Sequence, residues 1–145
     1  MDPDAIIEQL GLTRHPEGGY FRETWRDLPA DGGRGSGSAI YFLLTEDERS
    51  HWHRVDAAEA WHHYAGAALE LAIAEEDEHL VVTLGDDLVS GAEPQCVVPP
   101  RAWQAARTLG PWTLVGCTVA PAFDFSGFEL APPAWAPPDW TIEGW

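Results

Sequence analysis

The chain has 145 residues, which fits one domain on the usual size of about 100 to 200 residues per domain. Hydrophobic residues make up 45% of it and 8 residues are Trp, so it can bury a core and is not a disordered protein. With 24 acidic residues against 8 basic ones, the formal net charge is -16. Such a surface repels phosphate backbones and anionic lipids, so we expect no nucleic-acid partner and no membrane partner.

The absence of lysine excludes two kinds of active site. All 8 basic residues are Arg, so the chain has neither a Schiff-base lysine nor the lysine of a phosphate-binding loop. The Gly-rich segment 31–37 is followed by a β-like run instead of a helix, and we therefore expect no nucleotide cofactor. Residues 1–11 contain no basic leader or apolar stretch, and no run of about 18 apolar residues occurs elsewhere, so we expect a cytoplasmic protein.

One short helix is predicted at the N-terminus. Asp2 is a favourable cap, Pro3 suits the first helical position, and Gly11 ends the apolar pattern of Ile6 and Leu10.

Most of the remaining chain consists of β-like runs separated by Gly, Pro and acidic turns. The runs cover residues 19–26, 38–45, 50–54, 59–65, 69–74, 79–84, 95–98, 102–108 and 112–120. Short strands at this spacing are typical of an all-β sandwich or barrel with antiparallel pairing. Residues 131–138 are rich in Pro, so we expect an extended tail whose Trp135, Trp140 and Trp145 lie against the body or a partner subunit.

The segment 50–66, SHWHRVDAAEAWHHYAG, holds the densest group of metal-ligand side chains. On a regular strand, the period of two places His51 and His53 on one face. After a turn, Glu59 and His63 share one face of the next strand, with Tyr64 on the other. Two imidazoles and a carboxylate in one cavity are typical ligands of Zn, Fe, Mn or Ni. The alternative is a partly wet β surface that carries histidines without a site.

Two further segments carry polar residues that a turn does not require. Residues 97–106 predict a strand, a Pro turn and a return strand with Trp103 and Gln104, although a plain hairpin with an exposed Gln104 fits as well. Glu17, Tyr20, Arg22 and Glu23 lie in a Gly-containing strand, where Arg22 and Glu23 either contribute to a site or are merely solvated on opposite faces. Phenylalanines in segment 123–128 have a spacing that closes a barrel end.

Together these residues resemble the cupin superfamily. His51-x-His53, Glu59, Gly66 and the later Pro turn are similar to its two motifs. Over about residues 5–130, the segments HPEGGYFRE (15–23), AIYFLL (39–44), WHRVD (52–56), EAWH (59–62) and VGCTVAP (115–121) resemble the small single-domain cupins of the cupin-5 group, which has no assigned reaction. The resemblance implies an all-β double-stranded β-helix, or jelly-roll barrel, with a short N-terminal helix and a pocket in the barrel mouth. It implies one cupin domain over residues 1–145, with the barrel at about 15–130 and the tail at 131–145.

Carried over by position, the cupin metal ligands fall on His51, His53 and Glu59, and the late histidine of the second motif falls on Gln104. Two departures stand out: His53 and Glu59 are farther apart than in the usual motif, and Pro100-Arg101 replaces a small residue and Gly. A metal-free pocket therefore stays open as an alternative.

Three functions follow. The first is a metal-dependent enzyme for a small polar or sugar-like molecule, with a divalent ion on the four positions just named. The second is a metal-free epimerase or isomerase in which His53 abstracts a proton beside a carbonyl, Glu59 orients it, and Tyr41 or Tyr64 returns a proton. The third is a non-catalytic binding module with tryptophans as stacking platforms. The residues expected to contact the small-molecule ligand are Arg22, Glu23, Trp52, Trp61, His63, Trp103 and Gln104.

We expect a homodimer, because strand edges and tail tryptophans need cover and because the resemblance implies pairing. With a formal charge of -16 on each chain, added salt should screen the repulsion and tighten the dimer. Light scattering at micromolar concentration and moderate salt should give the mass of two chains of 15.9 kDa each; the mass of one chain would contradict the expectation.

Overall fold

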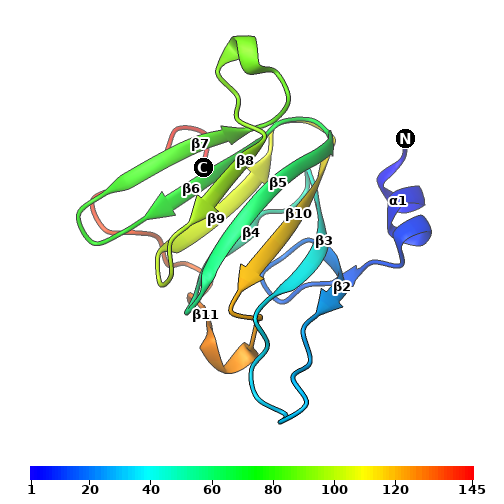
Figure 1. Ribbon diagram of the computed structural model, residues 1–145. Coiled ribbons are helices and arrows are strands. Elements are labelled where there is room, and N and C mark those ends of the chain that lie inside the picture. Colours follow the sequence, from blue (N-terminus) through cyan, green and yellow to red (C-terminus); the bar gives the residue numbers. More distant parts are fainter.

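In the computed structural model, which describes residues 1–145, the chain begins with α1 (Pro3–Leu10). The Asp2 side chain accepts a hydrogen bond from the Asp4 backbone N–H at 2.8 Å, and Gly11 ends the helix with φ 65°. Ile6 is buried with Leu12 and Leu43, which fixes the helix outside the barrel (Figure 1). The predicted helix is confirmed, and nothing helical in the chain is long or apolar enough to span a membrane.

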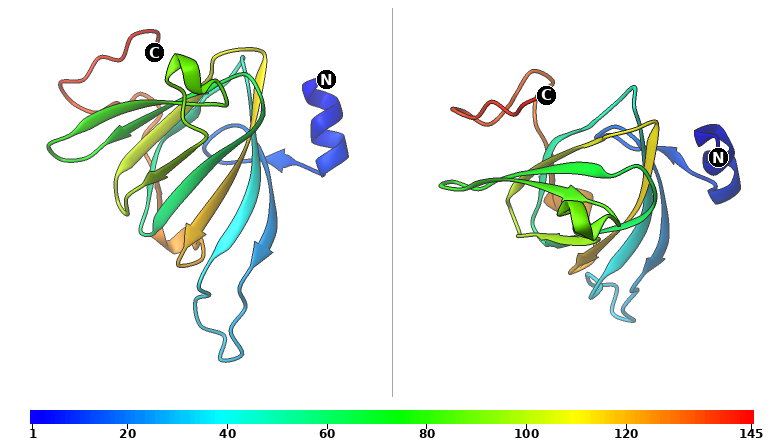
Figure 2. Two further views of the ribbon diagram at one scale, coloured as in Figure 1. Left: turned by 45° about the horizontal axis from the view of Figure 1, so that its top comes forward. Right: turned by 90° about the horizontal axis from the view of Figure 1, so that it is seen from above.

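Two antiparallel sheets form the body. The first contains, in spatial order, β1 (Thr13–Arg14), β2 (Tyr20–Arg26), β3 (Ser38–Thr45), β10 (Trp112–Ala120), β5 (Ala58–Gly66) and β8 (Gln95–Val98). The second contains β11 (Phe128–Leu130), β4 (Ser50–Val55), β9 (Trp103–Thr108), β6 (Leu69–Ala74) and β7 (His79–Leu84). Short 3₁₀ turns, η1 (Leu88–Ser90) and η2 (Phe125–Gly127), lie in the connections. The sheets face one another as a jelly-roll barrel (Figure 2), so the predicted all-β fold is confirmed.

Strand boundaries follow the predicted runs closely. Strands β3, β6, β7, β8 and β10 have the predicted bounds, whereas the very short β1 and β11 were not predicted. Two and three residues are too few to show alternation in a sequence. The core between the sheets is a cluster of 12 buried residues that includes Phe42, Trp61 and Leu71.

Two irregularities in strand pairing decide which side chains face the interior. The register shifts between Glu23 and Trp25, where β2 pairs with β3, and between Ser50 and His53, where β4 pairs with β9. An extra residue in a strand breaks the alternation of faces, so side chains beyond it are re-aimed. Both irregularities lie beside the cavity described below.

The C-terminal tail, residues 131–145, crosses the outer side of the second sheet (red in Figure 2). The ring centroids of Trp135, Trp140 and Trp145 lie 6.1, 5.9 and 6.0 Å from that of Trp52. His79 of β7 stacks on Trp140 at 4.5 Å. The tail therefore lies against the body of its own chain, and Trp52 lies beneath it.

Replacing Trp52 with Ala should destabilise the fold by about 3–5 kcal/mol, because a buried indole leaves a cavity that the tail cannot fill. Trp52 is only 5% exposed. Chemical denaturation measures the change, and Val89→Ala, at a fully exposed position, serves as a control expected to stay within about 0.5 kcal/mol. Equal stability of the two variants would contradict the packing role of the tail.

Candidate functional site

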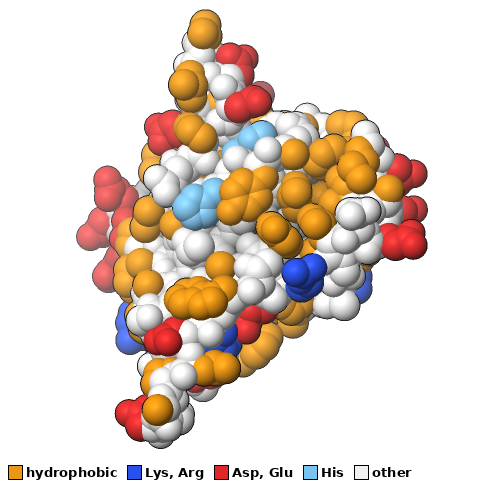
Figure 3. Space-filling view, turned by 45° about the vertical axis from the view of Figure 1, so that its right-hand side comes forward, with side chains coloured by type: hydrophobic (Ala, Val, Ile, Leu, Met, Phe, Trp, Pro, Cys, Tyr) orange, Lys and Arg blue, Asp and Glu red, His pale blue; other side chains and the backbone are white.

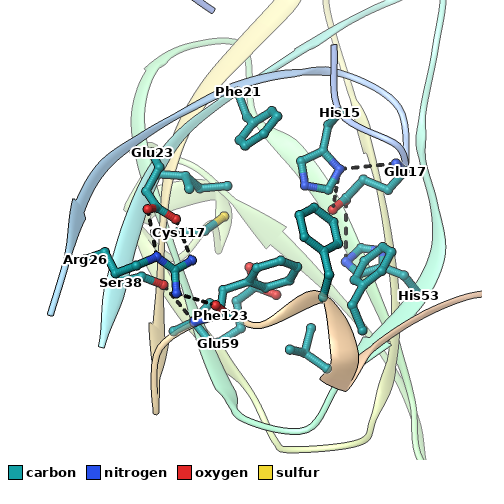
Figure 4. A pocket seen from close by; sticks show the side chains of 15 residues that line it. His15, Glu17, Phe21, Glu23, Arg26, Ser38, His53, Glu59, Cys117 and Phe123 are labelled. Atoms are coloured by element: carbon teal, nitrogen blue, oxygen red, sulfur yellow. Dashed lines mark hydrogen bonds and ion pairs between the residues drawn. The ribbon is translucent and has the colours of Figure 1, made fainter. Parts of the chain in front are cut away.

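A small cavity opens at the end of the barrel near the 121–127 loop (Figure 4). Its volume is about 70 Å³, measured as the space open to the centres of water molecules. Since about 10–15 Å³ on this measure holds one water, the cavity has room for a few waters or a ligand of several heavy atoms. Its polar lining is His15, Glu17, Glu23, Arg26, Ser38, His53, Glu59 and Cys117, and its apolar lining is Phe21, Ile40, Val55, Val119, Phe123, Phe125 and Phe128.

His53 reaches the cavity because of the irregularity in β4. Ser50 and His53 both point inward and are 0% and 1% exposed, while His51 and Trp52 between them point outward. The Nδ1 of His53 lies 2.7 Å from the carbonyl oxygen of His51. A carbonyl can only accept, so Nδ1 carries the proton and the neutral ring presents the lone pair of Nε2 to the cavity.

Glu17 comes from the loop before β2 and lies against β4. Gly18, with φ 106°, allows this approach, because a Cβ there would collide with the carbonyl oxygen of Arg49. The carbonyl of Glu17 accepts the His51 backbone N–H at 2.8 Å, and its carboxyl group accepts a short hydrogen bond from the Ser50 hydroxyl. One carboxyl oxygen of Glu17 lies 3.4 Å from Nε2 of His53.

His15 completes this side of the cavity. Its Nδ1 accepts the Glu17 backbone N–H at 3.2 Å and lies 3.3 Å from the other carboxyl oxygen of Glu17. Nδ1 therefore holds a lone pair as well. The carboxyl group of Glu17 thus faces two imidazole lone pairs, an arrangement that suits a protonated acid and disfavours an anion.

Glu59 lies on β5 and is held by a buried amide. Nε2 of Gln104 donates to Oε1 of Glu59 at 2.9 Å, and Oε1 of Gln104 accepts the indole N–H of Trp61 at 2.8 Å. The Cys117 thiol lines the same cavity as Glu59. Because the indole can only donate, it fixes the amide orientation and so aims the Gln104 N–H at the carboxylate.

Burial shifts all four titratable groups toward their neutral forms. Loss of water raises the pKa of Glu17 to about 8, despite the Ser50 hydrogen bond, and raises the pKa of Glu59 to about 7, where His53 opposes the rise. Burial lowers the pKa of His15 to about 4 and lowers the pKa of His53. At neutral pH the cavity therefore holds uncharged imidazoles beside carboxyl groups that titrate near neutrality.

Of the predicted site residues, His53, Glu59 and Glu23 line the cavity. Gln104 lies behind Glu59 and contacts it, and Trp61 is a core residue that is 1% exposed. Three of the predicted residues thus form the cavity wall, whereas Gln104 and Trp61 lie behind Glu59 and hold it in place.

Other predicted site residues lie away from this cavity. Tyr41 and Tyr64 contact one another at a ring distance of 6.4 Å, and Tyr64 is 55% exposed. On the face seen in Figure 3, histidine and hydrophobic side chains lie side by side. Arg22 donates to the Leu10 carbonyl at 2.7 Å, and His63 is bonded to the Ala67 carbonyl at 3.0 Å. None of these four side chains lines the cavity.

The tryptophans expected to stack on a ligand are also used for packing. Trp52 is covered by the tail, as described above. Trp103 lies between Trp135, at a ring distance of 4.6 Å, and Arg54, whose guanidinium carbon is 4.4 Å from the ring centroid. Neither indole faces the cavity.

Of the four expected metal ligands, only His53 and Glu59 line the cavity together. His51 turns outward, where its Nε2 is 2.9 Å from the Pro132 carbonyl, because β4 is irregular and does not alternate as predicted. Both ends of the Gln104 amide are engaged with Trp61 and Glu59. No three His, Cys, Asp or Glu side chains are arranged to hold an ion. The residues therefore do not fit the metal centre that the resemblance implied, and the divalent ion stays a prediction.

His15, Glu17, Ser50 and Arg26 are absent from the predicted catalytic, ligand-binding and metal residues, although Glu17 lies in the polar segment noted in the sequence. Sequence signals exist for the first two: the HPEGG segment places a histidine and a glutamate before two glycines of positive φ. Such a pair marks a close backbone approach, and polar residues beside it are candidates for a site.

Comparisons with known proteins agree with this architecture. The chain matches the Cupin_5 family, described as Cupin superfamily (DUF985), over residues 4–131. A solved protein from Shewanella oneidensis is 39% identical, with a TM-score of 0.86 over 90% of this chain and 85% of that one. A hypothetical protein from Leishmania major is 30% identical, with a TM-score of 0.81 over 89% of this chain and 86% of that one. None of the curated proteins is significantly similar to the chain.

More distant structures share the fold alone. Oxalate decarboxylase from Bacillus subtilis is 13% identical, with a TM-score of 0.63, and the match covers 81% of this chain but only 29% of that enzyme. The family match spans nearly the whole barrel. This chain therefore belongs to the Cupin_5 family of the cupin superfamily.

Proposed function

We propose that this protein is an enzyme that moves a proton at a carbon next to a carbonyl group of a small molecule, as isomerases and epimerases do. The observation that carries the proposal is the position of His53, whose Nε2 lone pair faces the cavity beside two buried carboxyl groups. This deepens the isomerase hypothesis from the sequence but assigns the acid to Glu17 instead of Tyr41 or Tyr64.

His53 is the base in this mechanism. Its tautomer is held by the bond to the His51 carbonyl, so Nε2 is ready to accept a proton from the substrate carbon. The imidazolium that forms is stabilised by Glu59, whose charge acts to raise the pKa of His53. Gln104 keeps the Glu59 carboxylate aimed and hydrogen-bonded during this change.

Glu17 is the acid. As a neutral carboxylic acid it gives its proton to the carbonyl oxygen while His53 takes the proton from carbon, which yields an enediol without a free charge in the apolar cavity. The contacts of 3.3 and 3.4 Å to the imidazole nitrogens are long for hydrogen bonds, so neither partner holds the acid proton tightly. Delivery of the proton from His53 to the former carbonyl carbon, with the hydroxyl proton of the other carbon passing to the Glu17 carboxylate, completes an isomerisation and restores both residues, whereas return to the original carbon regenerates the substrate.

Replacing His53 with Gln should lower the rate at which solvent deuterium replaces the carbon-bound protons of dihydroxyacetone by a factor of about 100 or more. The reason is that a positioned base contributes about 10²–10⁴-fold to such a rate. Proton NMR in D₂O follows the loss of signal. The matched control is His51→Gln, which removes an imidazole that lies two residues away and points outward. If both variants lose exchange equally, His51 belongs to the site and the acid–base proposal is wrong.

Replacing Glu17 with Gln should stabilise the protein in a pH-dependent way. The pKa of Glu17 rises from an ordinary 4.5 to about 8 on folding, so the folded state binds the proton more tightly and stability falls as pH rises between these values. Gln mimics the neutral acid and does not titrate. The difference in melting temperature between Glu17→Gln and the parent should therefore increase by several degrees in favour of the variant from pH 5 to pH 8.5.

Thermal denaturation at the two pH values checks this, with Glu76→Gln at an exposed turn as the control. The control should show the same small difference at both pH values. A constant difference for Glu17→Gln would mean that Glu17 is ionised throughout, and Glu17 could not then serve as the acid.

A further inference from the structure

A second polar pair lies across the cavity from the histidines, on strand β2 (Figure 4). The guanidinium of Arg26 donates from Nε to one oxygen of Glu23 at 2.9 Å and from a terminal nitrogen to the other at 2.7 Å. Residues three apart on a regular strand point to opposite faces. The irregularity between Glu23 and Trp25 brings both side chains to the cavity side. A strand irregularity that re-aims two side chains toward one pocket is typical of a functional site.

The pair keeps hydrogen-bonding capacity for a ligand. Arg26 also donates to the Phe123 carbonyl at 2.6 Å. With the two bonds to Glu23, three of the five N–H groups of the guanidinium are used and two are left. The Glu23 carboxylate accepts only from Arg26, so lone pairs remain. The side chains are 31% and 36% exposed. A donor and an acceptor therefore stand side by side at the rim, which is the pattern that a hydroxyl group matches.

Charge in the cavity argues against an anionic ligand. Arg26 is the only arginine or lysine that lines it, and Glu23 neutralises this charge with a two-point contact. The remaining titratable groups are imidazoles, held neutral by burial, and the carboxyl groups of Glu17 and Glu59, which add negative charge when they ionise. No positive charge is left over to bind a carboxylate or phosphate. The phenylalanines beside the pair suit an uncharged ligand with an apolar face.

We propose that the Arg26–Glu23 pair is the recognition site for a hydroxyl group, and that the substrate is a small uncharged hydroxycarbonyl compound. The inference rests on the proposed function for the reaction, but it concerns binding. The ligand spans the cavity, with its hydroxyl end at Arg26 and Glu23 and its carbonyl end at His53 and Glu17.

The test compares two probes of equal size, dihydroxyacetone and pyruvate, which have the same number of heavy atoms and differ in charge. Binding of each is measured by ligand-observed NMR or calorimetry, independently of turnover. The parent should bind dihydroxyacetone in preference to pyruvate. Glu23→Gln frees the Arg26 charge, so the ratio of pyruvate to dihydroxyacetone affinity should rise by about tenfold or more. Arg26→Gln leaves the Glu23 charge alone and should change the ratio in the opposite direction.

The matched control is Glu129→Gln, which breaks an ion pair of the same chemistry with Arg54 outside the cavity. It should leave the ratio unchanged. If Glu23→Gln leaves the ratio within twofold of the parent, or if dihydroxyacetone does not bind the parent at all, the recognition proposal is overturned. If the ratio changes as expected while no deuterium exchange occurs, recognition stands and the acid–base function fails.

Discussion

Removal of water from four titratable side chains is the constraint on which this site depends. His15, Glu17, His53 and Glu59 share the interior of a barrel whose other walls are mostly apolar. Each group loses hydration on burial, and the one arginine that lines the cavity, Arg26, is paired with Glu23. Burial therefore favours the neutral forms, and the groups form hydrogen bonds with one another, with other side chains and with the backbone. No buried polar side-chain atom is left without a partner.

The hydrogen bonds of the site also fix the tautomers of the two histidines and the orientation of the Gln104 amide. The His51 carbonyl determines the tautomer of His53, and the Glu17 backbone N–H determines that of His15. On β5, the Trp61 indole does the same for the Gln104 amide, which is turned toward Glu59. His53, His15 and the Gln104 amide thus each have an orientation set by a group that can only donate or only accept. Such fixed orientations are what the proposed proton transfer requires, because little reorientation is needed when charge moves.

The fold could be predicted from the sequence much further than the site. Alternating apolar residues between Gly and Pro turns indicated strands such as β3 and β10 correctly, because those strands are regular and half-buried. His51 and His53 were placed together by the same rule, which fails where β4 gains an extra residue. Register depends on pairing with a distant strand, so one strand's pattern does not reveal it. The burial of Glu17 could not be predicted for another reason, since loop residues have no periodicity from which burial can be inferred.

The close contact at Gly18 ties two distant parts of the chain into one mechanical unit. Because its α-carbon lies against the Arg49 carbonyl, the loop that carries Glu17 cannot shift without displacing the start of β4, which carries Ser50 and His53. An insertion in either segment would separate the Glu17 carboxyl group from the Ser50 hydroxyl and from His53 together. Grafting this arrangement onto another barrel would require both segments and both glycines to be transplanted as a pair.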